Sequence, residues 1–119
     1  MRICIDIDGT LCSLREPHQA YSELEPFTDV ADKIKHLKDQ GCYIILSATQ
    51  EEEIFKPTNT YQTKAKQGAV LQEWLDTNGF VYDEIWIGKP DAQVYINDKL
   101  LKFGGSWEGL EEKYLKNYL

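Results

Sequence analysis

Four short apolar runs, each followed by polar residues, are the feature of this sequence that most restricts its fold. The runs lie at Ile3–Ile7 (interrupted by Asp6), Cys42–Leu46, Ile85–Ile87 and Val94–Ile96. Runs of this length, rich in β-branched and aromatic residues, are typical of short buried strands. Strands that are apolar throughout are buried on both faces, as in parallel sheets covered by helices.

Helical patterns separate or follow these runs. Helices are expected at about residues 28–41, 62–78 and 108–118. Thr28 is the expected N-cap of the first helix, and Gly41 is expected to end it. The polar segments 12–27 and 51–61 are expected to be loops. Together with a length of 119 residues, this alternation predicts a single α/β domain over residues 1–119, with a three-layer α/β/α Rossmann-like parallel sheet.

Composition excludes several classes of function. The formal net charge is −7 and no local basic patch is evident, so a nucleic-acid partner is not expected. No run approaches the roughly 18 apolar residues of a membrane span, and no signal peptide is recognisable at the N-terminus. Cys4, Cys12 and Cys42 lack a zinc-type spacing and fit free thiols in a reducing compartment. We therefore expect a cytoplasmic protein without membrane contact.

The carboxyl ends of parallel strands form the edge where α/β proteins bind ligands. The polar residues after the four predicted strands are Asp6 and Asp8, Ser47, Lys89, and Asn97 and Asp98. Asp6 and Asp8 are two residues apart, so their side chains point to the same side of an extended chain. Two carboxylates about 4 Å apart repel by about 4 kcal/mol at an effective dielectric of about 20, unless a cation lies between them or one is protonated. Gly9 then allows the backbone to turn sharply out of the strand.

The residue types at these strand ends suit a phosphoryl group bound with a hard cation. Asp6, Asp8 and Asp98 offer the oxygen ligands that Mg²⁺ prefers. Lys89 adds a positive charge and Ser47 adds a hydroxyl donor, which together can neutralise phosphoryl oxygens. One carboxylate can act as a nucleophile on phosphorus, and the other as general acid and base. The sequence thus suggests Mg²⁺-dependent phosphoryl transfer through an aspartyl-phosphate.

The same residues resemble the motifs of a known family. The stretch Asp6-Ile7-Asp8-Gly9-Thr10 resembles the DxDGT first motif of the haloacid dehalogenase (HAD) superfamily of phosphatases. Ser47 stands where the second-motif Ser/Thr belongs, and Lys89, followed by proline, looks like the third-motif lysine. Asn97-Asp98 resembles the fourth, acidic motif, although many short members carry Asp-Asp there. The second motif also lacks the arginine that often follows it. The resemblance spans about residues 1–103 and implies a HAD-like fold.

The resemblance also implies a role for each residue. Asp6 would be the nucleophile, and Asp8 the general acid and base. Mg²⁺ would be held by the Asp6 carboxylate, the Asp8 backbone carbonyl and Asp98. Ser47 would bond a phosphate oxygen, and Lys89 would pair with Asp6 and the phosphate. The supporting positions would be Gly9, Thr10 and Asn97.

The spacing between the motifs leaves no room for a cap domain, because segments 12–27 and 51–61 are both short. The resemblance therefore implies a capless member whose site is open or covered by a neighbouring subunit of a homo-oligomer. The stretches Glu73–Asp76, Tyr82–Ile85 and Gly88–Pro90 resemble the small capsule-biosynthesis phosphatase subgroup. That likeness suggests a small phosphomonoester substrate, such as a sugar phosphate of surface polysaccharide synthesis.

Two alternatives stay open at this stage. A non-catalytic HAD-like protein could bind a phosphorylated ligand without turning it over, although the intact Asp6 and Asp8 argue against it. A signalling receiver domain has a similar length, a parallel sheet, an acidic cluster and a lysine. In a receiver the phospho-accepting Asp ends a middle strand, whereas here the second run ends at Ser47 and the last acid follows Lys89.

Overall fold

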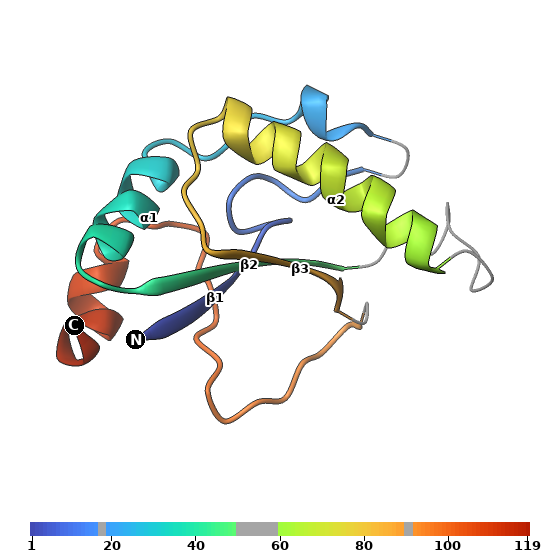
Figure 1. Ribbon diagram of the computed structural model, residues 1–119. Helices are drawn as coiled ribbons and strands as arrows, with labels where there is room; N and C mark the ends of the chain where they lie inside the picture. The colour runs from blue at the N-terminus through green and yellow to red at the C-terminus, as the bar shows by residue number, and fades with distance from the viewer. Residues whose placement is uncertain (17–18, 50–59, 90–91) are drawn as a thin grey trace.

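Among the residues that the structure describes, three parallel strands form the sheet at the centre of the fold (Figure 1). β1 (Arg2–Asp6) pairs with β2 (Tyr43–Thr49), and β2 pairs with β3 (Glu84–Lys89), so β2 is the central strand. The computed structural model describes residues 1–16, 19–49, 60–89 and 92–119. The predicted α/β class with a parallel sheet is confirmed, and three of the four apolar runs form its strands.

Two helices connect consecutive strands and lie above the sheet in Figure 1. α1 (Val30–Asp39) links β1 to β2, and α2 (Thr60–Thr77) links β2 to β3. The buried residues of α1 are Val30, Ile34 and Leu37, which recur at helical spacing. Those of α2 include Leu71, Trp74 and Leu75. The core of the protein therefore lies between these helices and one face of the sheet.

The two faces of the sheet differ in exposure. Ile5, Ile44 and Leu46 are buried against the helices, and alternate positions point to the opposite face. On that second face Cys4 is exposed and the Trp86 side chain is 63% exposed. The sheet is thus more open than its apolar runs predict. Asp6 and Ser47 fall on this second face by the same alternation.

The run Val94–Ile96 does not form the predicted fourth strand. Residues 92–103 instead follow an irregular path, drawn in orange, which leaves the sheet (Figure 1). The exposed fraction is 72% for Val94 and 97% for Ile96. A strand of three residues has few ladder hydrogen bonds and little stability of its own, so its apolar pattern alone does not determine its pairing.

The termini of the predicted helices also need correction. Asp29, not Thr28, is the residue before α1, and it has a positive φ of 65° and no side-chain hydrogen bond to the helix. The Thr28 cap was wrong because the preceding Phe27 is tied to the loop after β1, where its N–H bonds the Leu11 carbonyl at 2.8 Å. The predicted loop at 51–61 lies mainly outside the described residues, and α2 already begins at Thr60.

The C-terminal segment is helical but irregular. The sequence predicts an α-helix over 108–118, and the structure has a π-helical turn at Glu111–Leu115 followed by a 3₁₀ turn at Lys116–Tyr118. This segment packs beside α1, where Glu111 bonds both His36 and Gln40. Its helical character was therefore predicted, but its hydrogen-bond pattern was not.

Two expectations from composition can be compared with the structure. All three cysteines are free: Cys4 is exposed, whereas Cys12 and Cys42 are buried. In the part of the chain that the structure describes, no helix has the length and apolar character that a bilayer crossing requires.

Leu46→Ala should lower the free energy of unfolding by about 2–5 kcal/mol, because Leu46 is fully buried on the central strand and its truncation leaves a cavity. The matched control is Leu100→Ala, in the segment after β3, where the side chain is 56% exposed and the expected loss is below about 0.5 kcal/mol. Urea denaturation measures both. Similar losses for the two variants would mean that the segment after β3 packs on the sheet in solution.

Candidate active site

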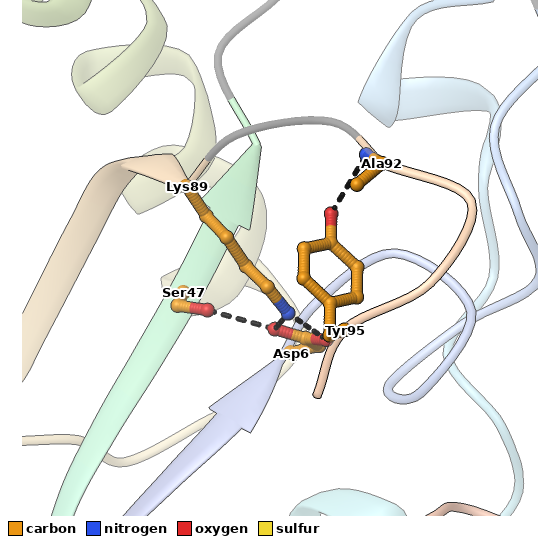
Figure 2. Close-up of polar contacts among 5 residues, drawn as sticks. All are labelled: Asp6, Ser47, Lys89, Ala92 and Tyr95. Carbon is orange, nitrogen blue, oxygen red and sulfur yellow. Dashed lines mark hydrogen bonds and ion pairs between the residues drawn. The ribbon is translucent and has the colours of Figure 1, made fainter. Parts of the chain in front are cut away.

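Three side chains from three neighbouring strands meet at the carboxyl edge of the sheet (Figure 2). Asp6 ends β1 and is in register with Ser47 on β2. The Ser47 hydroxyl donates a hydrogen bond to Asp6 Oδ1 at 2.8 Å. Lys89, at the end of β3, donates from Nζ to Oδ1 at 3.0 Å and to Oδ2 at 2.8 Å. The structure thus brings these three residues together, as parallel strand order predicts.

The Asp6 carboxylate remains accessible despite these contacts. The exposed fraction of its side chain is 45%, and that of Lys89 is 28%. Ser47 is buried, so its hydroxyl is positioned by the sheet and has Asp6 as its partner. At this exposure the ion pair adds little to stability. The ion pair matters for chemistry instead, because it places a solvent-facing carboxylate beside a cation and a hydroxyl at one edge of the protein.

Tyr95 lies against Lys89 in this site, and sequence reasoning missed it. The Lys89 ammonium is 4.1 Å from the centre of the Tyr95 ring, which is a cation–π contact. The Tyr95 hydroxyl accepts a hydrogen bond from the Ala92 N–H at 3.2 Å, as Figure 2 shows. Tyr95 belongs to the run Val94–Ile96, which predicted a buried strand, so nothing in the sequence indicated that Tyr95 would contact Lys89.

Asp8 follows β1 and has a different partner from Asp6. The Tyr21 hydroxyl donates to both carboxylate oxygens of Asp8, at 3.1 and 3.0 Å. Tyr21 lies in a 3₁₀ turn, Tyr21–Glu23, within the loop that follows β1. Sequence reasoning missed this residue as well, because a single tyrosine in a polar loop belongs to no motif.

Burial raises the pKa of the Asp8 carboxyl above its ordinary value. The neighbouring Asp6 charge adds to the rise in this pKa, whereas the Tyr21 hydrogen bond and the Arg15 charge oppose it. A carboxyl group with a raised pKa retains its proton closer to neutral pH, which is what a general acid requires. The two carboxyl groups at the end of β1 therefore have distinct environments, one paired with a cation and the other partly desolvated.

The loop after β1 turns sharply and is held at both ends. Gly9 has a positive φ of 79°, and a Cβ there would lie 3.0 Å from the Leu14 side chain. The Thr10 N–H bonds the Ile7 carbonyl at 3.2 Å, and the Thr10 carbonyl accepts a hydrogen bond from the Trp107 indole at 2.7 Å. These contacts hold the loop that carries Asp8 in place, and the supporting roles expected for Gly9 and Thr10 stay a prediction.

Comparison with known proteins reveals likeness at the level of structure. No family model and no curated protein sequence matches the chain. A solved structure of a target protein from Vibrio cholerae superimposes with a TM-score of 0.72 at 26% identity, covering 85% of this chain and 82% of that one. A D,D-heptose bisphosphate phosphatase from B. bronchiseptica, complexed with magnesium and phosphate, has a TM-score of 0.50 at 17% identity, covering 78% of this chain. The chain has a HAD-like fold.

A third solved structure, the Pnkp1/Rnl/Hen1 complex, has a TM-score of 0.50 at 25% identity and covers 96% of this chain. This chain spans only 53% of the heptose bisphosphate phosphatase and 34% of the matching chain in the complex. The likeness therefore supports the HAD-like fold of the shared domain.

The fourth-motif residues of the HAD-like pattern are not gathered with the other three motifs. Asn97 Oδ1 accepts a local hydrogen bond from the Lys99 N–H at 2.8 Å. Over the described residues there is no group of three or more His, Cys, Asp and Glu side chains that could hold a metal, so Asp98 does not complete one with Asp6 and Asp8. The physical reason is the missing fourth strand, whose pairing would bring its carboxyl end to the common edge. The role of Asp98 as a ligand stays a prediction.

The donor set at the end of β1 nevertheless fits Mg²⁺. Asp6 offers partly exposed carboxylate oxygens, and the backbone turn at Asp8 follows two residues later. Mg²⁺ in phosphoryl-transfer sites usually keeps several waters and takes only one or two carboxylates, the remaining ligands coming from the substrate phosphate. The Asp6 carboxylate and the backbone at Asp8 supply hard oxygen donors of this kind, and a substrate phosphate would supply the remaining ligands that do not come from the protein.

Proposed function

We propose that this HAD-like chain is a Mg²⁺-dependent phosphatase that hydrolyses a phosphomonoester through an aspartyl-phosphate on Asp6. The observation that carries the proposal is the contact of Asp6 with Ser47 and Lys89 at the ends of three adjacent strands. A cation and a hydroxyl donor beside a carboxylate nucleophile are what phosphoryl transfer requires. A solved structure that shares the fold adds support, since it is a phosphatase complexed with magnesium and phosphate.

In the first step, a carboxylate oxygen of Asp6 attacks phosphorus and forms a new P–O bond. The bond from phosphorus to the leaving oxygen breaks, and Asp8 supplies that oxygen with a proton. Lys89 and Ser47 neutralise the phosphoryl oxygens as charge develops on them. Mg²⁺, held by the Asp6 carboxylate and the Asp8 backbone carbonyl, would add Lewis-acid neutralisation when bound.

In the second step, water hydrolyses the aspartyl-phosphate. Asp8, now a carboxylate, takes a proton from the attacking water, and the P–O bond to Asp6 breaks. Inorganic phosphate leaves, and both carboxyl groups return to their starting states. The raised pKa of Asp8 suits this double role, because burial favours the protonated form that the first step needs.

The proposed substrate is a small phosphomonoester with an exposed phosphate. The short segments between the motifs leave Asp6 partly exposed, which suits a substrate that enters from solvent. The resemblance to the capsule-biosynthesis subgroup favours a sugar phosphate of surface polysaccharide synthesis, and a second subunit of a homo-oligomer is the proposed cover for the site. A screen of phosphorylated sugars, nucleotides and small acids would test the substrate class.

EDTA should lower hydrolysis of 4-nitrophenyl phosphate by at least about tenfold, and added Mg²⁺ should restore it, because the metal neutralises charge that the side chains alone do not. Release of 4-nitrophenolate measures the rate. No hydrolysis of any phosphomonoester in the presence of Mg²⁺ would favour the non-catalytic binding protein. A phosphorylated form that persists after incubation with acetyl phosphate, without turnover, would instead favour a receiver-like domain.

A further inference from the structure

A buried tyrosine in the loop after β1 has its hydroxyl directed at the proposed general acid. Tyr21 is only 2% exposed, and its hydroxyl lies 3.0 and 3.1 Å from the two carboxylate oxygens of Asp8. The same two residues are 13 positions apart in the chain, so the contact depends on how the loop folds. A buried polar tip of a tyrosine needs a hydrogen-bond partner, and Asp8 provides it.

The Tyr21 ring is held in place from more than one side. The Arg15 guanidinium lies 4.4 Å from the ring centre, and the Trp74 ring from α2 lies 5.9 Å away at an interplanar angle of 50°. The 3₁₀ turn that carries Tyr21 is closed by bonds between Ala20 and Glu23 in both directions. The hydroxyl therefore has little freedom to move away from Asp8.

We propose that Tyr21 is the positioning residue of the general acid: its hydroxyl orients the Asp8 carboxyl and stabilises the negative charge left on it when the leaving group takes its proton. This inference rests on the proposed function and deepens it. It assigns to a residue outside every recognised motif the task of preparing Asp8 for the first step.

The hydrogen bond acts on the rate because it strengthens during the reaction. As Asp6 attacks and the bond to the leaving oxygen breaks, one proton moves from Asp8 to that oxygen and Asp8 becomes a carboxylate. Tyr21 keeps its own proton, since a phenol is a much weaker acid than a carboxyl group. Hydrogen bonds to an ionised acceptor are roughly twice as strong as neutral ones, so the contact favours the transition state over the bound substrate.

The size of this effect should depend on the leaving group. Phenolate requires considerable proton transfer as it departs, whereas 4-nitrophenolate is a good leaving group that requires little. The two esters have nearly the same shape, so they differ mainly in their need for Asp8. Loss of the Tyr21 hydroxyl should therefore affect phenyl phosphate much more than 4-nitrophenyl phosphate.

The test uses Tyr21→Phe, which keeps the ring packed against Trp74 and Arg15 and removes only the hydroxyl. We expect kcat/KM to fall about tenfold for phenyl phosphate and by less than about threefold for 4-nitrophenyl phosphate, with Mg²⁺ present. The matched control is Tyr82→Phe, which removes a hydroxyl bonded to Asp76 at 3.1 Å outside the site. That variant should leave both rates unchanged.

A double-mutant cycle with Asp8→Asn separates positioning from general packing. If Tyr21 acts through Asp8, adding Tyr21→Phe to Asp8→Asn should not change the ratio of the two kcat/KM values further. This ratio does not depend on the folded fraction of a variant, so it stays informative if Tyr21→Phe is less stable. If Tyr21→Phe in the wild-type background lowers kcat/KM equally for both esters, so that the ratio of the two values is unchanged, the inference alone is overturned. A wild-type protein inactive on both esters would overturn the proposed function and the inference with it.

Discussion

Asp6→Asn is expected to abolish phosphatase turnover while the fold remains intact. An amide has nearly the same shape as a carboxylate and can still accept hydrogen bonds from Ser47 and Lys89, but it is not a nucleophile for phosphorus. Removing the nucleophile of an enzyme that uses covalent catalysis typically costs at least about 10³-fold in kcat. Hydrolysis of 4-nitrophenyl phosphate with Mg²⁺ measures the loss, and circular dichroism measures the fold.

The matched control for this variant is Asp39→Asn on α1. It makes the same chemical change in a side chain that is 62% exposed and paired with Lys35, away from the sheet edge. Activity should be unchanged. Trapping of phosphorylated protein in the wild type, and its absence in Asp6→Asn, would place the covalent bond. An Asp6→Asn protein within about tenfold of the wild-type rate would instead mean that no covalent step occurs on this residue.

Lys89→Met should lower kcat/KM for 4-nitrophenyl phosphate by about 10²- to 10³-fold, the usual effect of removing one preorganised group that stabilises developing charge. Lys89 is bonded to both carboxylate oxygens of Asp6, so its loss removes a positive charge and also the contact that orients the nucleophile. Methionine keeps most of the length of the side chain but lacks the ammonium that lies against the Tyr95 ring. Steady-state kinetics with Mg²⁺ measure the change.

Lys35→Met is the control, because this lysine forms an exposed pair with Asp39 one helical turn away on α1. Lys35→Met removes the same positive charge outside the site, so its kcat/KM should match that of the wild type. Partial recovery of activity in Lys89→Arg, relative to Lys89→Met, would support a role for the charge itself. Near wild-type kinetics in Lys89→Met would contradict the proposed mechanism, since Asp6 would then need no cation.

The meeting of Asp6, Ser47 and Lys89 could be predicted because it depends on chain order alone. Asp6 lies near the end of one short apolar run, Ser47 directly follows another, and Lys89 comes two residues after a third. Helical patterns between the runs indicate parallel strands. Parallel strands bring their carboxyl ends to one edge whatever the details of packing. The positions of these side chains therefore required no knowledge of the loops.

The predictions that failed concern segments whose local sequence only weakly favours one structure. The run Val94–Ile96 has the residues of a strand, but a strand of three residues forms few ladder hydrogen bonds, and the run lies exposed instead. Asp98 depends on that pairing, so its predicted place beside Asp6 was not reproduced among the described residues. The cap at Thr28 failed for a related reason: a tertiary contact of Phe27 determines how the chain enters α1.

The parallel α/β class and the strand ends around Asp6 follow from hydrophobic periodicity and chain order, which are properties of short segments of the sequence. The residues that act on these groups from outside the motifs depend instead on how the loops fold. Tyr21 reaches Asp8, and Tyr95 reaches Lys89, through irregular loops. Loop paths depend on many weak contacts made at long range in the chain, so no local pattern encodes where their side chains will lie.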